Sequence, residues 1–297
     1  MINLKPVHRI ATISKNEFIA AYKKLETPVI IEQLTRTWPA RRKWNLDYIC
    51  KIAGDNLVPL YGGGERANGR RHQHASIRKM RFRDYIELLK QGENQLRMFF
   101  YNILSEAPKL TEDFTYPEIG LNFFTKLPVM FFGGKGAKVQ MHFDIDLADI
   151  LLCHFGGKKR VYLFAPEQKK YLYHVPFSFS ALFDIDIEQP DFQTFPALQY
   201  LEGFVAELMH GDALYIPPGY WHYIVYEEIS FSMSLRAFPK QPKLFLRMLY
   251  NIIVIRNIEG LMRKLAGQSW SDRNELNAVK HTHRNLGIGV AGGMLQR

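Results

Sequence analysis

The chain has 297 residues, of which 47% are hydrophobic and 23% charged, and this balance excludes a disordered or fibrous protein. A chain of this length can bury one large core, or one core with an appended segment. Its 39 basic and 29 acidic residues give a formal net charge of +10. That charge permits binding to a polyanion such as RNA, although a solvated basic surface is the simpler interpretation.

The two cysteines, Cys50 and Cys153, are far apart and have no CxxC context. We therefore expect no disulfide framework and a reducing compartment. The first 18 residues lack the apolar core of a signal peptide. No uninterrupted apolar window reaches about 18 residues, the length that a transmembrane helix requires. The expectation is a cytoplasmic protein with no membrane partner.

The first 127 residues mix helical and extended patterns. Phe18, Ile19, Tyr22 and Leu25 fall near one helical face, and Ser14 is suited to cap that helix. The predicted elements are a helix at 15–26, a strand at 29–31, a helix at 45–52, a strand at 57–61, a glycine-rich loop at 62–71, a helix at 81–91 and a strand at 97–101. We expect them to form a mixed α/β region that packs on the rest of the chain.

Short apolar runs alternate with turn residues from about residue 128 to residue 238. Several short strands at this spacing are typical of a β-sandwich or barrel. After Pro242 the pattern is helical again, with Leu244, Met248, Ile252 and Ile255 at helix-like spacing. The predicted fold class is mainly β with flanking helices: a mixed region at 1–127, a β core at 128–238, and a helical region at 239–297 with a loose glycine-rich tail.

The predicted core contains a His-Phe-Asp sequence that suits metal binding. On a strand, residues i and i+2 point to the same face, so His142 and Asp144 can both face the interior of a barrel. Met141 and Phe143 then face the packing side. Taken alone, an HxD pattern is a weak signal, because any exposed strand can carry it.

A second segment, GDALYIPPGYWH, ends in His222. Its Gly-Asp turn, short apolar strand and Pro-Pro-Gly bend deliver His222 to the start of the next strand. Two imidazoles and one carboxylate form the facial triad typical of iron(II), which leaves coordination positions open. The order and context of His142, Asp144 and His222 favour such a metal site. The other histidines near the core are expected to be structural or surface groups: His174, His210 and His154, the last of which could line the pocket.

A metal held by such a triad usually takes 2-oxoglutarate as a chelating co-substrate, whose far carboxylate needs a cation on a neighbouring strand. The segment FGGKKRVYLF supplies candidates. Strand alternation places Lys159 on the same face as Val161 and Leu163, so an interior position for those two carries the lysine inward. An inward lysine is costly unless it meets an anion. The alternative is a turn with solvated basic residues at 158–160.

These motifs together resemble the JmjC or cupin-8 group of iron(II)- and 2-oxoglutarate-dependent oxygenases. The resemblance covers residues 128–238 through HFD, GGKKRVYLFAP and GDALYIPPGYWH. Within the group, KKRVYLFAPEQKKYLY and FDIDIEQPDFQTFPAL look closest to the tRNA wybutosine hydroxylase branch, and they also resemble the asparaginyl hydroxylase that acts on hypoxia-inducible factor. The resemblance implies a double-stranded β-helix (jelly roll), iron(II) at His142, Asp144 and His222, and 2-oxoglutarate paired with Lys159.

The chain departs from the group's pattern around the co-substrate. Val139 stands where many members have a Ser or Thr, three residues before the first metal histidine. The upstream tyrosine of many members would fall near Phe99 or Tyr101, and a common asparagine corresponds to Ser234. Because Phe99 has no hydroxyl, Tyr101 and Ser234 are the predicted co-substrate residues beside Lys159.

The expected activity is hydroxylation of a C–H bond in a macromolecule, either tRNA or a protein side chain. The charge and the branch resemblance favour tRNA, while a groove over the metal would also accept an extended peptide. A non-catalytic cupin that binds a metal or a small ligand is the alternative, with Val139 as the mark of a lost co-substrate site. The segment LFLRMLYNIIVIRNIEGLMRKL carries apolar residues over a wide arc, which predicts either a homodimer through the C-terminal helices or a helix packed on its own barrel.

Overall fold

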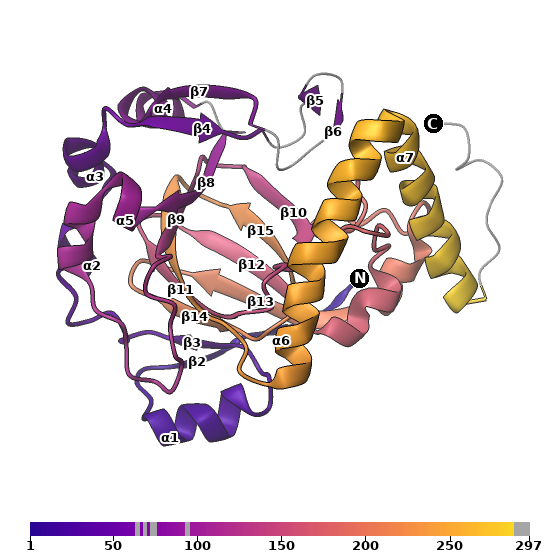
Figure 1. Cartoon of the computed structure of the whole chain (residues 1–297). Coiled ribbons are helices and arrows are strands. Elements are labelled where there is room, and N and C mark those ends of the chain that lie inside the picture. Colours follow the sequence, from indigo (N-terminus) through magenta and orange to yellow (C-terminus); the bar gives the residue numbers. More distant parts are fainter. Residues whose placement is uncertain (63–65, 68–69, 72–75, 93–95, 288–297) are drawn as a thin grey trace.

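The computed structural model describes residues 1–62, 66–67, 70–71, 76–92 and 96–287. Two large β-sheets form its centre (Figure 1). The five-stranded sheet has the order β1-β13-β12-β15-β10, with β1 at Asn3–Pro6, β10 at Lys138–His142, β12 at Lys159–Phe164, β13 at Glu202–Leu208 and β15 at Trp221–Tyr226. The seven-stranded sheet has the order β2-β3-β14-β11-β16-β9-β8, with β2 at His8–Ile10, β3 at Val29–Ile31, β8 at Arg97–Asn102, β9 at Val129–Gly133, β11 at Asp149–Phe155, β14 at Ala213–Ile216 and β16 at Ser230–Ala237. The prediction of a mainly β fold with flanking helices is confirmed.

Apolar side chains from both sheets form one of the molecule's buried clusters. Val161 and Leu163 of β12 belong to it, together with Ile150 of β11 and Leu214 of β14. Tyr162, between the two β12 residues, packs instead in a separate cluster on the outer face. The alternation predicted for this strand is therefore confirmed, and burial of these apolar side chains is the main driving force that holds the sheets together.

The N-terminal region contributes strands to both sheets. β1 pairs in parallel with β13, β3 pairs antiparallel with β14, and β8 pairs antiparallel with β9. The strands β1, β2 and β13 were not predicted. β1 and β2 are short and largely exposed, so their sequences show no apolar alternation that would indicate a strand.

The helices of this region are α1 at Lys15–Phe18, continued by the π-helical turn η1 at Ile19–Lys23, then α2 at Pro39–Lys43, α3 at Leu46–Ala53, α4 at Phe82–Lys90, α5 at Ile103–Glu106 and the 3-10 turn η2 at Pro108–Asp113. The three helices predicted in this region, at 15–26, 45–52 and 81–91, are confirmed as α1 with η1, α3 and α4, whereas α2, α5 and η2 were not predicted. Ser14 caps α1 in a capping box: its hydroxyl accepts from the Glu17 backbone N–H, and the Glu17 carboxylate accepts from the Ser14 N–H. At α3 the Asn45 side-chain oxygen accepts a single hydrogen bond from the Tyr48 backbone N–H.

Two small two-stranded sheets complete this region. β4 (Leu57–Leu60) pairs with β7 (Arg78–Arg81), and β5 (Arg66–Ala67) pairs with β6 (Arg70–Arg71). The β4–β7 pair lies beside α4 (Figure 1). The glycine-rich loop predicted at 62–71 contains β5 and β6, and its remaining residues from 63 onward lie outside the described part of the chain.

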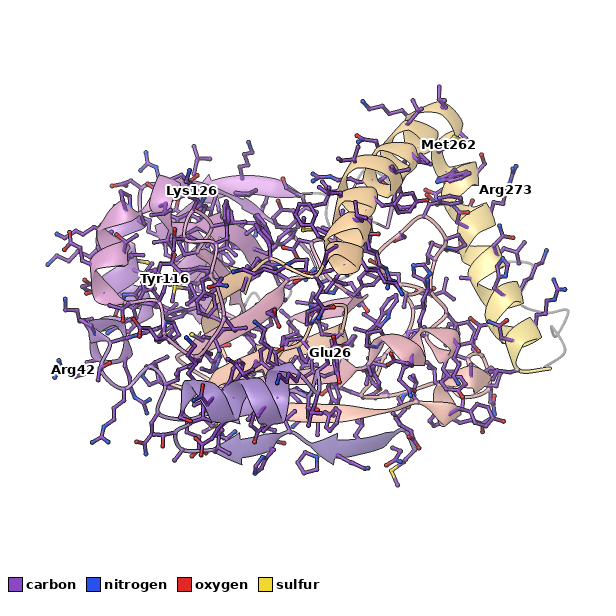
Figure 2. The ribbon with its side chains drawn as sticks, turned by 60° about the horizontal axis from the view of Figure 1, so that its bottom comes forward. Glu26, Arg42, Tyr116, Lys126, Met262 and Arg273 are labelled. Carbon is purple, nitrogen blue, oxygen red and sulfur yellow. The ribbon has the colours of Figure 1, made fainter. Side chains whose placement is uncertain are left out.

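The C-terminal region forms a helical hairpin at one side of the sheets (Figure 1). It consists of α6 (Pro242–Leu249), the π-helical segment η5 (Tyr250–Ile255) and α7 (Arg256–Asn285), which bends at Gly267 (φ 56°). Figure 2 labels Met262 and Arg273 on the two sides of this bend. None of the helices in the described ranges is long and apolar enough to cross a membrane. The predicted loose tail at 288–297 lies outside the described residues.

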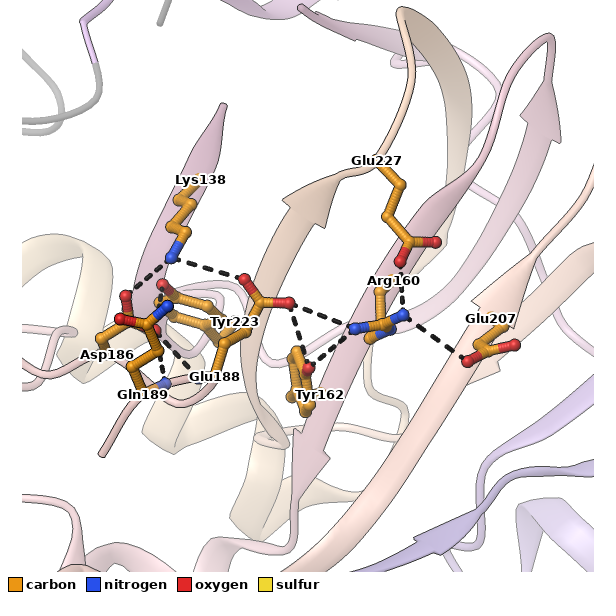
Figure 3. Close-up of polar contacts among 9 residues, drawn as sticks. All are labelled: Lys138, Arg160, Tyr162, Asp186, Glu188, Gln189, Glu207, Tyr223 and Glu227. Atoms are coloured by element: carbon orange, nitrogen blue, oxygen red, sulfur yellow. Dashed lines mark hydrogen bonds and ion pairs between the residues drawn. The ribbon is translucent and has the colours of Figure 1, made fainter. Parts of the chain in front are cut away.

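The long segment between β12 and β13 covers the outer face of the five-stranded sheet. It contains the 3-10 turns η3 (Pro166–Tyr171) and η4 (Pro196–Tyr200), and its apolar side chains pack with those of β10, β12 and β15. A polar network fixes its central part to the sheet (Figure 3). Lys138 bonds to Asp186 at 2.6 Å and pairs with Glu188, while Arg160 joins Glu188 to Glu227. The network thus ties β10 and β12 to the segment that covers them.

Candidate metal centre

A β-bulge brings His142 and His222 opposite each other. In the pairing of β10 with β15, Val139 lies opposite Ile224 and His142 lies opposite His222. These two pairs are three residues apart along β10 but only two residues apart along β15. The extra residue in β10 shifts the register and places the two imidazole centroids 4.2 Å apart. Asp144 Oδ1 lies 3.8 Å from His142 Nε2, and one donor atom from each of the three residues lies within 4.8 Å of the others.

The predicted triad is thus assembled, although strand alternation explains it only in part. β10 ends at His142, so Asp144 reaches the site from the loop that follows and not from the strand. The packing side was predicted correctly: Met141 is buried in the outer cluster, and Phe143 meets Trp221 edge to face at 4.8 Å.

The backbone fixes both imidazoles in the tautomer that a metal needs. Nδ1 of His142 lies 2.8 Å from the carbonyl of Gln140, and Nδ1 of His222 lies 3.2 Å from the carbonyl of Tyr220. A carbonyl oxygen can only accept, so each Nδ1 carries the proton and each Nε2 keeps its lone pair. Burial lowers the pKa of His222, which favours the neutral ring. Both histidines are therefore prepared to bind a metal through Nε2.

Arg236 of β16 holds the carboxylate of the triad from the opposite sheet. Its Nη2 donates to Asp144 Oδ2 at 2.8 Å, and its Nη1 donates to Asp146 Oδ2 at 2.6 Å. Burial alone would raise the pKa of Asp144, but Arg236 and the two histidines outweigh it and hold the pKa well below its usual range. Since Arg236 occupies Oδ2, Oδ1 is the oxygen directed toward the two imidazoles.

A cavity of about 90 Å³ lies between the two sheets and includes the triad. A single water needs only about 10–15 Å³ measured in this way, so a small organic acid has room. The walls are mostly apolar, with Met98, Phe131, Val139, Ile150 and Leu152 among them. Five residues with polar groups line the cavity besides the triad: Arg97, Lys159, Tyr226, Ser234 and Arg236.

Lys159 lies inside the cavity, as the sequence predicted. Only 1% of its surface is exposed, and burial lowers the pKa of its amine to about 7. The amine donates to Ser232 Oγ at 2.7 Å and lies 4.3 Å from the centroid of the Tyr226 ring. Among the described residues no carboxylate pairs with it, which is the environment expected of a lysine whose partner is a bound anion.

His154 supports Lys159 indirectly, through the Ser232 hydroxyl. The Ser232 hydroxyl lies 2.9 Å from His154 Nδ1, and His154 Nε2 lies 3.2 Å from the carbonyl of Gly157. The carbonyl requires a proton on Nε2, so Ser232 donates to Nδ1 while it accepts from Lys159. His154 is thus structural, as expected, and so are His174 and His210, whose Nε2 atoms donate to the carbonyls of Ser178 and Arg41.

Several polar atoms that face the cavity lack an internal partner. Within the described residues, the Ser234 hydroxyl, Arg97 Nε and Arg236 Nε are buried without a hydrogen bond. Buried polar atoms are almost always paired in folded proteins. Unpartnered donors around a cavity with a two-histidine, one-carboxylate donor set fit a bound metal together with an anionic ligand.

Tyr101, predicted to bind the co-substrate, does not line the cavity. Its hydroxyl accepts from Asn56 Nδ2 at 2.7 Å, and its ring stacks on Phe82, in the core outside the cavity. The cause is a bulge in β8. Met98 lies opposite Phe132 and Tyr101 lies opposite Met130, so the two pairs are three residues apart along β8 but only two residues apart along β9. The bulge turns Tyr101 away from the face that Arg97 and Phe99 present.

Sequence reasoning also missed three residues of the site, Arg97, Tyr226 and Arg236. All three are buried and line the cavity. For Arg236, a signal was available: an arginine in the otherwise uncharged run SFSMSLRA needs an internal anion if that strand is buried.

The two sheets and the triad are those of a cupin-like domain with a candidate metal centre. Comparison with known proteins identifies the family: the model of the cupin-like domain matches residues 15–238. The chain belongs to this family of cupin-like JmjC domains, as its motifs predicted.

The chain is similar to curated proteins, some of which are named for different activities. It is 30% identical over 234 residues to Jumonji C domain-containing protein 5 of Drosophila melanogaster, covering 74% of this chain and 57% of that protein. It is 28% identical to lysine-specific demethylase 8 of Danio rerio (77% and 58% covered) and 23% identical to human tRNA wybutosine-synthesizing protein 5 (77% of each). The chain thus spans little more than half the length of the first two. The predicted resemblance to the wybutosine branch has a counterpart among the relatives, at lower identity than the other two.

Proposed function

We propose that the protein is an iron(II)- and 2-oxoglutarate-dependent oxygenase that hydroxylates a C–H bond of a macromolecule. The observation that carries this proposal is that one cavity is lined both by the triad and by Lys159, a buried lysine with no carboxylate partner among the described residues. Lys159 lies four residues along β12 from Leu163, the residue opposite His222. That is about 13 Å along the strand, a span that a lysine side chain and a five-carbon diacid can bridge together. We further propose that the two sheets form the family's double-stranded β-helix, with residues 128–238 as its core and 1–127 and 239–297 as flanking regions.

The residues of the chain have distinct parts in this proposal. The Nε2 atoms of His142 and His222 and Oδ1 of Asp144 hold the metal, and Lys159 holds the far carboxylate of the co-substrate. When bound, the metal and the co-substrate would supply the oxidising chemistry, in which 2-oxoglutarate, oxygen and a substrate C–H bond give succinate, carbon dioxide and a C–OH group. Apolar walls such as Ile150 exclude water from the reacting atoms.

The test is oxygen-dependent formation of succinate. Wild-type protein with iron(II) should convert 2-oxoglutarate to succinate in the presence of its substrate, and the His142→Ala variant should not. If no substrate pool, whether tRNA or cellular protein, induces succinate formation above that of His142→Ala, the oxygenase proposal fails.

The substrate is proposed to be either tRNA or a protein side chain, and separate observations support each. The net charge of +10 and the relative named for tRNA wybutosine synthesis support RNA. The relatives named lysine-specific demethylases support a protein. Mass spectrometry of both pools after incubation distinguishes them by a gain of one oxygen atom. If RNA is the substrate, its binding should weaken steeply with salt.

A non-catalytic cupin remains the second candidate, because Val139 puts a methyl group where the family pattern has a hydroxyl. Calorimetry separates the two functions. A metal-binding cupin without activity should bind a divalent metal but give no heat with 2-oxoglutarate.

We also propose a homodimer through the C-terminal helices. Large apolar side chains are exposed along α6, η5 and α7, among them Leu246 (63% exposed), Ile253 and Leu265 (73%). Large apolar side chains that gather on a protein surface usually mark an association site, which supports this proposal. Light scattering should give the mass of two chains, and Ile253→Glu should give the mass of one; a monomeric wild type would contradict the proposal.

A further inference from the structure

Arg97, the first residue of β8, is a buried cation with no anionic partner in the described part of the chain. Only 4% of its surface is exposed. Its Nη2 donates to the carbonyl of Gly62 at 3.1 Å, and its Nε has no hydrogen bond. Burial lowers the pKa of Arg97, but a guanidinium remains charged under all ordinary conditions. A buried charge that no anion balances destabilises a fold, so its presence calls for an explanation.

The second buried cation faces the same cavity. Arg97 and Lys159 both line it, the first from the seven-stranded sheet and the second from the five-stranded sheet. Neither pairs with a carboxylate of the described residues. Between them the cavity is lined by apolar side chains such as Phe131 and Leu152, which do not screen two positive charges. An anion bound between the two sheets would compensate both.

Tyr226 and Gly133 connect the strand of Lys159 to the strand of Arg97. Tyr226 lies opposite Lys159 in the pairing of β12 with β15, and Gly133 lies opposite Arg97 in the pairing of β8 with β9. A Cβ atom at Gly133 would lie 2.6 Å from the Tyr226 ring, so this glycine makes room for the ring beside Arg97. Burial raises the pKa of Tyr226, and Arg97 offsets part of that rise, so the neutral hydroxyl lies within the field of the guanidinium.

We propose that Arg97 is a second anchor for the carboxylate of the co-substrate, which is held between its guanidinium and the amine of Lys159. This inference rests on the proposed dependence on 2-oxoglutarate. A guanidinium forms short, charge-assisted hydrogen bonds to a carboxylate, and the unpartnered Nε is available for one of them. Arg97 would thereby replace the hydroxyl that the family pattern has at position 139, where this chain has valine.

The test measures binding of two acids to protein loaded with manganese(II), without oxygen, by calorimetry. 2-Oxoglutarate has the far carboxylate, and 2-oxobutyrate has the same metal-chelating end without it. In Arg97→Met, 2-oxoglutarate should bind at least about tenfold more weakly than in wild type, whereas the affinity for 2-oxobutyrate should stay within about threefold. Arg97→Lys should recover part of the loss, and Arg78→Met, which removes an exposed arginine of β7, should bind both acids as wild type does.

The outcomes separate this inference from the proposed function. If wild type does not bind 2-oxoglutarate, the proposed function fails and the inference fails with it. If wild type binds it and Arg97→Met binds it equally well, or loses both acids equally, only the role of Arg97 is overturned. The melting temperature without ligand gives an independent check. Loss of an unpaired buried charge should leave it unchanged or raise it, and a variant that melts lower or does not fold would assign Arg97 a structural role instead.

Discussion

Arg236 donates a hydrogen bond from one sheet to Asp144 beside the other, with Nη2 2.8 Å from Oδ2. One of the two oxygens of the triad's carboxylate is therefore engaged before any metal binds. The same guanidinium binds Asp146. Its single positive charge offsets part of the charge of two half-buried carboxylates and leaves one oxygen of Asp144 for a metal. The geometry of the metal centre therefore depends on a residue that does not bind the metal.

Replacement of Arg236 by glutamine should destabilise the metal-free protein. Two half-buried carboxylates would be left close together without a cation, so the loss should be part of the about 3–5 kcal/mol that removal of one partner from a fully buried ion pair typically costs. Chemical denaturation at neutral pH measures the loss of unfolding free energy. Arg236→Lys, which keeps the charge, should lose less. A glutamine variant as stable as wild type would show that Arg236 does not balance these charges.

Binding of 2-oxoglutarate should weaken as the pH rises above 7. The pKa of Lys159 is about 7 in the folded, ligand-free protein, against an ordinary value of 10.5. Below pH 7 the amine is already charged, and above it the amine must take up a proton to meet the carboxylate, so the affinity falls by up to about tenfold per pH unit. Calorimetry at pH 8.5 in buffers of different ionisation enthalpy should detect this proton uptake, and Lys159→Met should not show it. Binding without proton uptake in wild type would contradict the assignment.

The same pKa shift also affects stability. Between pH 7 and about 10.5 the unfolded chain binds more protons at Lys159 than the folded chain does, so this residue makes the ligand-free protein more stable as the pH rises through that window.

Gly133→Ala should destabilise the protein and disturb the cavity. The added Cβ would lie 2.6 Å from the buried Tyr226 ring, which must then move from its place beside Lys159. Overpacking of this kind costs about 1–3 kcal/mol. Gly260→Ala in α7 is the matched control: its Cβ meets no atom within 4 Å, and alanine favours a helix over glycine by about 1 kcal/mol. Equal unfolding midpoints for Gly133→Ala and wild type would show that the ring adapts freely.

The metal triad could be predicted from the sequence because each member has a local signal. His142 and Asp144 are two residues apart in an apolar strand pattern, and the GDALYIPPGYWH turn positions His222. Lys159 followed from alternation with two residues whose apolar character is clear. These predictions use only local signals: a period of two along one strand for His142, Asp144 and Lys159, and a turn motif for His222.

The position of Tyr101 could not be predicted in this way, because a bulge interrupts the period. Regular alternation gives Arg97, Phe99 and Tyr101 the same face, and one extra residue in β8 separates Tyr101 from the other two. No feature of RMFFYN indicates where that residue is inserted. The contact between Arg236 and Asp144 could not be predicted either, since it joins a strand of one sheet to the loop that follows a strand of the other, 92 residues apart in the sequence.

The most direct test of the central claim is the visible spectrum of the iron(II) protein under nitrogen. If His142, Asp144 and His222 hold iron(II) with positions open for 2-oxoglutarate, addition of 2-oxoglutarate should produce a weak visible charge-transfer band. The band should saturate with one equivalent per chain and be absent in His222→Ala. Absence of the band in wild type at saturating iron(II) and 2-oxoglutarate would contradict the proposed metal centre and its co-substrate.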